Sequence, residues 1–472
     1  MAGLDRRNLA PPQVFAQSVS GAAPAAAMAV TPAIVAAQAG SATIWSFAVA
    51  TVLALLIASC IGQFTSRMAA AGSLYSLTAK GLGSVPAFLC GSGLLIGYGL
   101  LTMSALVGAA MHLGGLAGLL GMPKIGGTVG VLVALLVLAA VVATCLVRGV
   151  RVAASVVLLV EAVSIGLMLV VFGTLLVKHR TLLDTHQLLP GRLDLGAVIA
   201  GVLPALAAFI GFEAAAALGV EARRPFRTIP RAVRGTAALT GVLSLSAGYT
   251  QVASFSGVPG GLAAQPDPVP TLAMAEQLPW LSVLLTAGLA TSFFACSVAT
   301  STALVRLLLS AGRERVLPAA LGRTHRRFRT PHVAVAVALP VVALVPVGLI
   351  GIGMAPSRVL VVLLTTATLG YLLAYLLVCL AAPVFLHRIG ELTVLPVVTA
   401  SIIVPVLLMV LIAYVAAGPA GVALIVVGAV LVMSAARYLW LRARNPNRVA
   451  AIGLYDETSV ADVFGAPSRP RR

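Results

Sequence analysis

The sequence predicts an all-α integral membrane protein with twelve spanning helices. Of its 472 residues, 60% are hydrophobic and only 9% are charged, whereas soluble domains carry about 25% charged residues. A span needs roughly 20 apolar residues, and the chain offers about twelve such runs. They are too long and too uniformly apolar for the strands of a membrane barrel. We place the spans at residues 13–38, 42–66, 84–111, 126–147, 152–177, 196–220, 232–255, 279–311, 331–353, 357–386, 393–417 and 419–441.

Lys and Arg are distributed unequally between the two sides of these spans. With the N-terminus inside, the cytoplasmic loops and helix ends hold all but five of the 31 basic residues. This positive-inside pattern predicts a protein of the cytoplasmic membrane with both termini in the cytoplasm. The net charge of +18 is therefore assigned to topology and to lipid headgroups, and no nucleic-acid partner is expected. The external side holds Lys124, Lys178, Arg180, Arg192 and Arg358.

The spans define the domain organisation. Residues 1–12 form a cytoplasmic tail, residues 13–441 form the membrane domain, and residues 442–472 are predicted to be a disordered cytoplasmic tail because they are polar and rich in Arg and Pro. The five cysteines fall inside spans, where we expect buried thiols. No catalytic, cofactor-binding or metal-ligating set of residues is found, so neither an enzyme nor a metal site is predicted.

Two spans carry features that interrupt a helix. Residues 18–24 (SVSGAAP) combine Gly and Pro in the middle of the first span, and Gly211 lies in the middle of the sixth. Such residues free backbone groups, which are tolerated at membrane depth where they line a cavity; a packed kink is the alternative for the first span. The two candidates lie five spans apart, as an inverted 5+5 repeat requires (residues 13–177 and 196–386), and paired broken helices point to a transporter site.

Two acidic residues lie well inside spans, Glu161 in the fifth and Glu213 in the sixth. A charged group at the bilayer centre costs about 2.5–3.5 kcal/mol on insertion scales, so each is a functional candidate. A carboxyl group removed from water disfavours its charged form and can load and release a proton. We therefore name both as coupling candidates, with a structural or cavity-lining role as the alternative.

Several segments resemble the amino acid–polyamine–organocation (APC) permeases. Residues 211–213 (GFE), 221–225 (EARRP) and 227–232 (RTIPRA) look like the sixth helix and the following loop of that family. Residues 306–318 (RLLLSAGRERVLP) resemble its R-x-L-(YF)-x-x-(GA)-R-(DE)-G-x-L-P segment, and residues 73–75 (SLY) resemble the start of its third helix. The resemblance implies two inverted five-helix repeats, with the first and sixth helices unwound around a substrate and two further helices outside the repeat. It also places Glu161 near a position where some proton-coupled members carry a titratable Lys.

The predicted function is secondary transport of amino acids or related amines. Half-helix N-termini offer N–H groups to a carboxylate, and half-helix C-termini offer carbonyls to an ammonium group. Proton symport, sodium symport and exchange all stay open, with Glu161 favouring protons; a sensor or channel is the less favoured alternative. The predicted substrate contacts are Ser20, Gly21, Ala22, Ala23, Phe209, Ile210 and Gly211, together with Thr300 and Ser301 from the hydroxyl cluster of the eighth span.

Other classes of membrane protein fit the sequence less well. The loop after the second span does not match the G-x-x-x-D-R-x-G-R-type loop of major facilitators, and no GxxxxGK(ST) motif of an ATP-driven pump occurs. The last two spans are expected to serve packing or dimerisation, and Gly93 and Gly97 in the third span are expected to bring helices close together.

Overall fold

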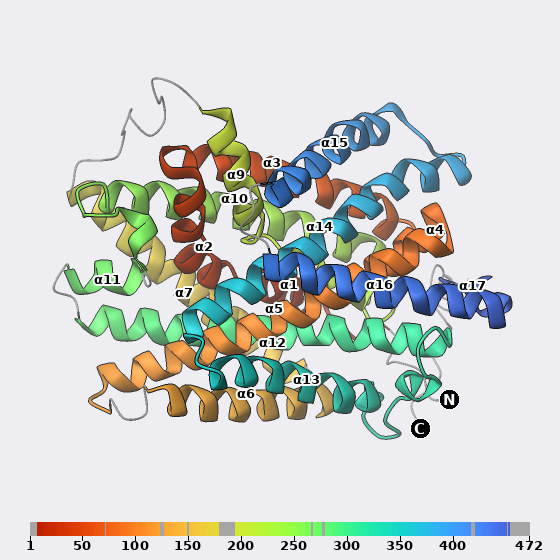
Figure 1. Ribbon diagram of the computed structural model, residues 1–472, viewed down its shortest axis with the longest axis horizontal. Coiled ribbons are helices and arrows are strands. Elements are labelled where there is room, and N and C mark those ends of the chain that lie inside the picture. Colours follow the sequence, from red (N-terminus) through yellow and green to blue (C-terminus); the bar gives the residue numbers. More distant parts are fainter. Residues whose placement is uncertain are drawn as a thin grey trace.

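A computed structural model describes residues 7–70, 72–122, 127–148, 151–178, 194–265, 268–275, 279–416, 421–450 and 452–453. These residues form an all-helical bundle (Figure 1) with no strand among them, which confirms the predicted all-α class. The α-helices are α1 (Pro11–Ala22), α2 (Pro24–Ala39), α3 (Thr43–Thr65), α4 (Leu74–Leu82), α5 (Ser84–Leu119), α6 (Thr128–Arg148), α7 (Arg151–Lys178), α9 (Leu195–Leu206), α10 (Pro225–Ser254), α11 (Pro268–Ala275), α12 (Pro279–Arg313), α13 (His332–Gly351), α14 (Pro356–Arg388), α15 (Val394–Ala416), α16 (Gly421–Arg444) and α17 (Pro446–Ala450).

Within the described residues, eight helical segments are long and apolar enough to cross a membrane. One of them, Pro11–Thr65, contains the first two predicted spans. The fifth and sixth predicted spans correspond to shorter apolar stretches, Glu161–Val177 and Leu195–Leu206. The seventh corresponds to α10, whose first ten residues include three arginines.

The first predicted span is broken, as expected. Helix α1 ends at Ala22, Ala23 takes a left-handed conformation (φ 46°, ψ 64°), and α2 begins at Pro24. Proline is favoured at a first helical position because it has no N–H to leave unpaired there. The Gly-Ala-Ala-Pro sequence therefore ends one helix and starts the next within three residues.

The sixth predicted span is broken as well. Helix α9 ends at Leu206, two residues after Pro204, and a turn leads to Gly211, whose φ is +93°. The chain then continues as a 3₁₀-helix, η2 (Phe212–Leu218). A left-handed φ is readily accessible to glycine because it has no Cβ, so Gly211 fixes the position of this turn.

The core lies where α5 packs between α12 and α14, which run close to it along the bundle (Figure 1). An added Cβ at Gly93 would lie 2.7 Å from the Gly370 carbonyl oxygen, and one at Gly97 would lie 2.8 Å from the Tyr371 ring. This confirms the predicted role of Gly93 and Gly97 in close helix packing.

At the outside of the bundle, only 11% of the apolar stretch of α16 is buried.

The structure differs from the prediction at two places. The loop between the second and third predicted spans is partly helical, because α4 begins at Leu74, within the residues that resemble the start of a helix, and is separated from α5 by Gly83 (φ +89°). The tail predicted to be disordered from residue 442 begins as helix, because α16 continues to Arg444 and Pro446 starts α17. Val449 and Ile452 are buried against the bundle, which holds this segment in place. Residues 454–472 of the tail and the loop at 179–193 lie outside the described residues.

Candidate functional site

The two helix breaks touch each other in the middle of the bundle. A Cβ built on Gly211 would lie 2.3 Å from the Gly21 carbonyl oxygen, and one built on Gly21 would lie 2.4 Å from the Gly211 carbonyl oxygen. The Ser18 hydroxyl also donates a hydrogen bond to the Phe212 carbonyl. Such an approach of two backbones is open only to residues without a Cβ. Gly21 and Gly211, which lie at the two helix breaks, therefore also allow the two breaks to pack directly against each other.

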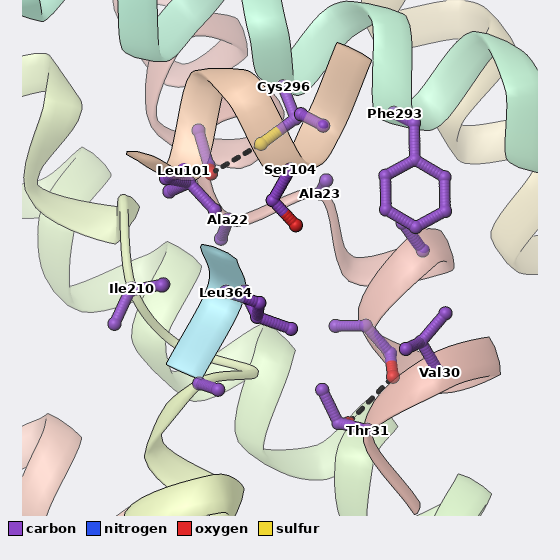
Figure 2. A pocket seen from close by; sticks show the side chains of 15 residues that line it. Ala22, Ala23, Val30, Thr31, Leu101, Ser104, Ile210, Phe293, Cys296 and Leu364 are labelled. Atoms are coloured by element: carbon purple, nitrogen blue, oxygen red, sulfur yellow. Dashed lines mark hydrogen bonds between the residues drawn. The ribbon is translucent and has the colours of Figure 1, made fainter. Parts of the chain in front are cut away.

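A pocket opens beside this contact, with a volume of about 40 Å³ (Figure 2). A water needs about 10–15 Å³ of such volume, so the pocket has room for only a few waters in this conformation. The side chains that line it come from both breaks, one face of α2, and helices α5, α12 and α14. They are Gly21, Ala22, Ala23, Ala26, Ala27, Val30, Thr31, Leu101, Ser104, Ala105, Ala207, Ile210, Phe293, Cys296 and Leu364.

The structure brings only part of the predicted contact set to this pocket. Gly21, Ala22, Ala23 and Ile210 line it, whereas Ser20, Phe209 and Gly211 are not among its lining residues. Phe209 is 1% exposed and packs in the core instead. The residues missed on α2, which are Ala26, Ala27, Val30 and Thr31, follow Ala23 at helical spacing and therefore share its face. Once the helix start at Pro24 is known, this face could have been predicted.

The hydroxyl cluster of α12 lies next to the pocket but does not line it. The Thr300 hydroxyl contacts the Thr102 hydroxyl of α5 at 2.8 Å, and the Ser301 hydroxyl donates to the Ser297 carbonyl of its own helix. The α12 side chains that reach the pocket are Phe293 and Cys296, and the Cys296 thiol lies 3.4 Å from the Gly21 carbonyl oxygen (Figure 2). Thr300 and Ser301 thus serve helix packing in this conformation.

Glu161 lies at the start of α2. Its carboxyl oxygen Oε1 accepts a hydrogen bond of 2.9 Å from the Ala25 N–H, and the side chain is 2% exposed. The Ser292 hydroxyl of α12 accepts the neighbouring Ala26 N–H at 3.3 Å. The first N–H groups of a helix have no partner within the helix, and they carry partial positive charge. Glu161 is therefore a carboxyl group placed on the positive end of a broken helix.

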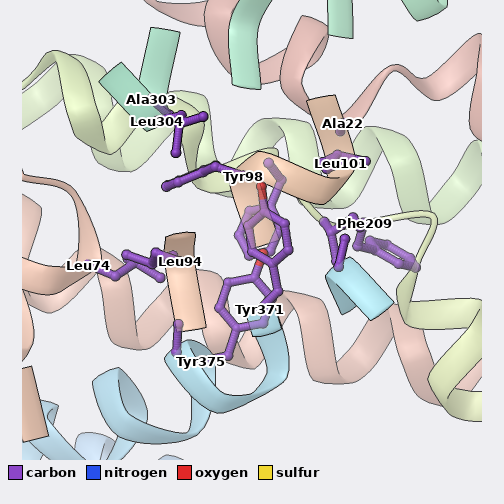
Figure 3. Packing of buried hydrophobic residues seen from close by; sticks show 14 of the residues in the cluster. Ala22, Leu74, Leu94, Tyr98, Leu101, Phe209, Ala303, Leu304, Tyr371 and Tyr375 are labelled. Atoms are coloured by element: carbon purple, nitrogen blue, oxygen red, sulfur yellow. The ribbon is translucent and has the colours of Figure 1, made fainter. Parts of the chain in front are cut away.

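Glu213 lies in η2, two residues after Gly211, among three tyrosines. Its Oε2 accepts a hydrogen bond of 2.6 Å from the Tyr375 hydroxyl, and Glu213 is fully buried. The Tyr371 ring packs between the rings of Tyr375 and Tyr98, with centroid distances of 5.8 and 5.4 Å (Figure 3). None of these tyrosines was predicted as part of the site, because they come from distant spans and carry no local motif.

A salt bridge joins α12 to the segment that follows η2, near residues 7–9. The Arg306 guanidinium of α12 lies 2.6 Å from the Glu221 carboxylate, and the two side chains are 12% and 10% exposed. Residues of the N-terminal segment also pair with this region, where the Leu9 N–H donates to the Glu221 carbonyl at 2.9 Å. Arg306 and Glu221 thus form a largely buried ion pair that joins α12 to the segment after η2.

Replacing Glu221 with glutamine is expected to destabilise the protein by about 3–5 kcal/mol, because it leaves the Arg306 charge buried without its partner. The matched control is Glu391→Gln, which breaks a more exposed pair with Arg67 and is expected to cost at most about 1 kcal/mol. Thermal unfolding of both variants in detergent measures the difference. Equal, small shifts would contradict the structural role assigned to this salt bridge.

No group of three or more His, Cys, Asp or Glu side chains within the described residues is arranged to hold a metal ion. The five cysteines, all in described helices, are free thiols. The chemistry available around the breaks is therefore that of backbone dipoles, hydroxyls and two buried carboxyl groups.

Comparisons with known proteins agree with this geometry. The family model for amino acid permeases matches residues 12–436. The branched-chain amino acid permease BcaP of Lactococcus lactis is 27% identical over 314 residues, which are 63% of this chain and 66% of the relative. The chloroplastic cationic amino acid transporter 7 of Arabidopsis thaliana is 24% identical over 310 residues, which are 62% of this chain and 52% of the relative. The alignments thus span between about half and two thirds of these relatives.

Among solved structures, a manganese transporter of Eremococcus coleocola shares the fold with a TM-score of 0.50. The alignment covers 92% of this chain and 95% of that chain, at 15% sequence identity. This likeness concerns the fold alone. Because the family model covers nearly the whole bundle, the chain belongs to the amino acid permease family, within the amino acid–polyamine–organocation superfamily.

Proposed function

We propose that this protein is a secondary active transporter that moves amino acids across the cytoplasmic membrane by alternating access. The observation that carries the proposal is the contact between the two broken helices beside a pocket at the centre of the bundle. Irregular backbone at membrane depth is tolerated where it lines a cavity, and paired broken helices are typical of transporter sites. Membership of a permease family supports the same conclusion.

The proposed architecture is an inverted repeat of five spans and five spans. The first repeat would comprise α1 to α7, and the second would comprise α9 to α14. The proposal is supported by the position of the breaks, one in the first span of each half. Helices α15 and α16 would lie outside the repeat, where their exposed apolar side chains face lipid or a second copy of the chain.

The size of the pocket supports a mechanism in which its walls move. A volume of about 40 Å³ is enough for a few waters but not for an amino acid. The helices around the breaks must therefore separate before a substrate binds. At the end that we assign to the cytoplasm, the Arg306–Glu221 ion pair must part for the substrate to leave on that side.

The lining favours a neutral, apolar amino acid. No charged side chain lines the pocket, and six of its residues are alanines. A polyamine with several ammonium groups would need acidic side chains that this lining lacks. The proposed contacts are the backbone of Gly21, Ala22 and Ala23 and the side chain of Ile210. Two of the relatives are named as branched-chain amino acid permeases, which agrees with this choice.

Proton coupling is the proposed source of energy, with Glu161 as the coupling group. It is buried at a helix end beside the pocket, where gain or loss of a proton changes the local charge directly. Glu213, buried in η2 with Tyr375 as its hydrogen-bond partner, is the second coupling candidate. Exchange of one amino acid for another is the alternative function, and sodium is the alternative coupling ion.

Uptake into proteoliposomes tests the proposed activity. Radiolabelled L-leucine, L-alanine, L-lysine and L-glutamate are each supplied outside, with liposomes that lack the protein as the control. We expect L-leucine or L-alanine to equilibrate faster in the presence of the protein. Equal rates for all four amino acids with and without protein would contradict the proposal and favour a sensor.

A change in pocket size is expected to alter selectivity. Ala105 of α5 lines the pocket and is 1% exposed, so Ala105→Leu fills space that a large substrate side chain would occupy. We expect uptake of L-leucine to fall about 10–200-fold relative to that of L-alanine. The control is Ala140→Leu, on an exposed face of α6. An equal loss for both substrates would place the substrate side chain elsewhere.

A further inference from the structure

The first turn of α2 has no free backbone N–H. Pro24 carries none, the Ala25 N–H donates to Glu161 at 2.9 Å, and the Ala26 N–H donates to Ser292 at 3.3 Å. The Ala27 N–H donates to the Ala23 carbonyl at 2.9 Å. A carboxylate from outside can therefore obtain an N–H of this turn only by displacing Glu161 or Ser292.

The same turn borders the pocket. Ala23, Ala26 and Ala27 line it, and the N–H of Ala25, in the same turn, is the one that Glu161 accepts. No charged side chain lines the pocket, so the positive end of α2 is the feature best suited to an anionic group there. Glu161 holds that position with one oxygen, and its Oε2 has no hydrogen-bond partner among the described residues.

The groups around Glu161 leave its charge unbalanced by a cation. From α12, the Ser292 hydroxyl and the Cys296 thiol face it. Helices α1 and α2 contain no titratable residue. Helix α10 has arginines only in its first ten residues and Tyr249 near its other end. Helix α7 itself has Arg151 and Lys178 at its two ends. The negative charge of Glu161 can thus be balanced by the partial positive charge at the N-terminus of α2 or removed by protonation of the carboxylate.

We infer that Glu161 is an internal competitor of the substrate carboxylate for the N-terminus of α2. Ionised Glu161 holds the Ala25 N–H through a charge-assisted hydrogen bond, which is roughly twice as strong as a neutral one. Protonated Glu161 holds it weakly, and the carboxylate of an amino acid in the pocket takes its place. This inference rests on the proposed function, because it requires that an amino acid binds in this pocket.

The pH dependence of substrate binding has a defined sign. Binding of the carboxylate favours protonated Glu161, and protonation of Glu161 favours binding of the carboxylate, since the coupling between two sites is reciprocal. Affinity for an amino acid should therefore fall as the pH rises. The limit for one linked proton is about tenfold per pH unit. A substrate analogue without a carboxylate should not show this dependence.

The experiment measures binding of radiolabelled L-leucine and L-leucinamide to the purified protein between about pH 5 and pH 7, where both keep their ammonium charge. We expect the Kd for L-leucine to rise several-fold per pH unit and the Kd for L-leucinamide to stay nearly constant. A flat Kd for L-leucine, or the same slope for both compounds, would overturn the inference without use of any variant.

Three variants sharpen the test. Glu161→Gln mimics the protonated state and should bind L-leucine at all pH values about as tightly as the wild type does at low pH. Ser292→Ala removes a neutral group beside Glu161 and should keep a pH slope of the same sign, and Glu391→Gln is the surface control. If the Kd of Glu161→Gln for L-leucine still rises with pH, the inference is wrong, whereas the proposed transport function is unaffected. If no amino acid binds or moves at all, the proposed function fails and the inference fails with it.

Discussion

Replacing Gly211 with alanine is expected to abolish transport. The residue has φ +93°, and its added Cβ would lie 2.3 Å from the Gly21 carbonyl oxygen. The left-handed conformation alone costs roughly 1–2 kcal/mol for a residue with a Cβ. The clash with a backbone atom can be relieved only by moving the two breaks apart. Uptake of radiolabelled L-leucine, normalised to the amount of protein in the membrane, measures the loss.

Two companion variants identify the cause. Gly21→Ala produces the same crossing clash, at 2.4 Å from the Gly211 carbonyl oxygen, without the left-handed φ of Gly211, so it should also lose transport. Gly99→Ala is the matched control, because an added Cβ at this buried glycine of α5 meets nothing within 4 Å. It should transport normally, since alanine is favoured over glycine inside a helix by about 0.5–1 kcal/mol. Normal uptake by Gly211→Ala would show that the crossing does not organise the site.

Replacing Glu161 with glutamine is expected to abolish the accumulation that a pH gradient drives, while exchange continues. Glutamine cannot carry the proton, but its amide oxygen can still accept the Ala25 N–H that Glu161 accepts at 2.9 Å. The helix break should therefore keep its structure. Exchange of internal for external L-leucine then serves as the internal measure that the variant is folded and binds substrate.

Glu391→Gln is the control for this second prediction, since it makes the same chemical change at a carboxylate that is 56% exposed. It should accumulate L-leucine as the wild type does. Full accumulation by Glu161→Gln under the same gradient would remove Glu161 as the coupling group. Loss of both accumulation and exchange would instead assign it a structural role at the start of α2.

The helix breaks could be predicted from the sequence because glycine and proline act locally. Pro24 has no N–H and Gly211 accepts a left-handed φ, and both effects are independent of the partners that surround them. Glu161 could be named for a similar reason, since a carboxyl group inside an apolar run must find a partner wherever it lies. The identity of that partner, the Ala25 N–H, could not be predicted from the sequence.

The predictions that failed depended on the rotation of a helix about its axis or on contacts between residues far apart in the sequence. The spacing of hydroxyls along α12 predicted that Thr300 would contact the substrate. The rotation of the helix instead directs the Thr300 side chain to Thr102 and the Cys296 side chain to the pocket. The partner of Glu213 is Tyr375, 162 residues away, and no local pattern marks it. The tail after residue 442 was judged by its polar composition, whereas a few apolar residues such as Ile452 are enough to hold its first part on the bundle.

If the paired helix breaks form the site of a proton-coupled amino acid transporter, an inward proton gradient must drive uptake of the substrate. Proteoliposomes containing the wild-type protein receive radiolabelled L-leucine with and without an inward proton gradient. We predict that the gradient drives L-leucine above its equilibrium distribution and that a protonophore abolishes this accumulation. Flux that requires amino acid inside the vesicles and does not depend on the gradient would contradict proton-coupled transport and identify an exchanger.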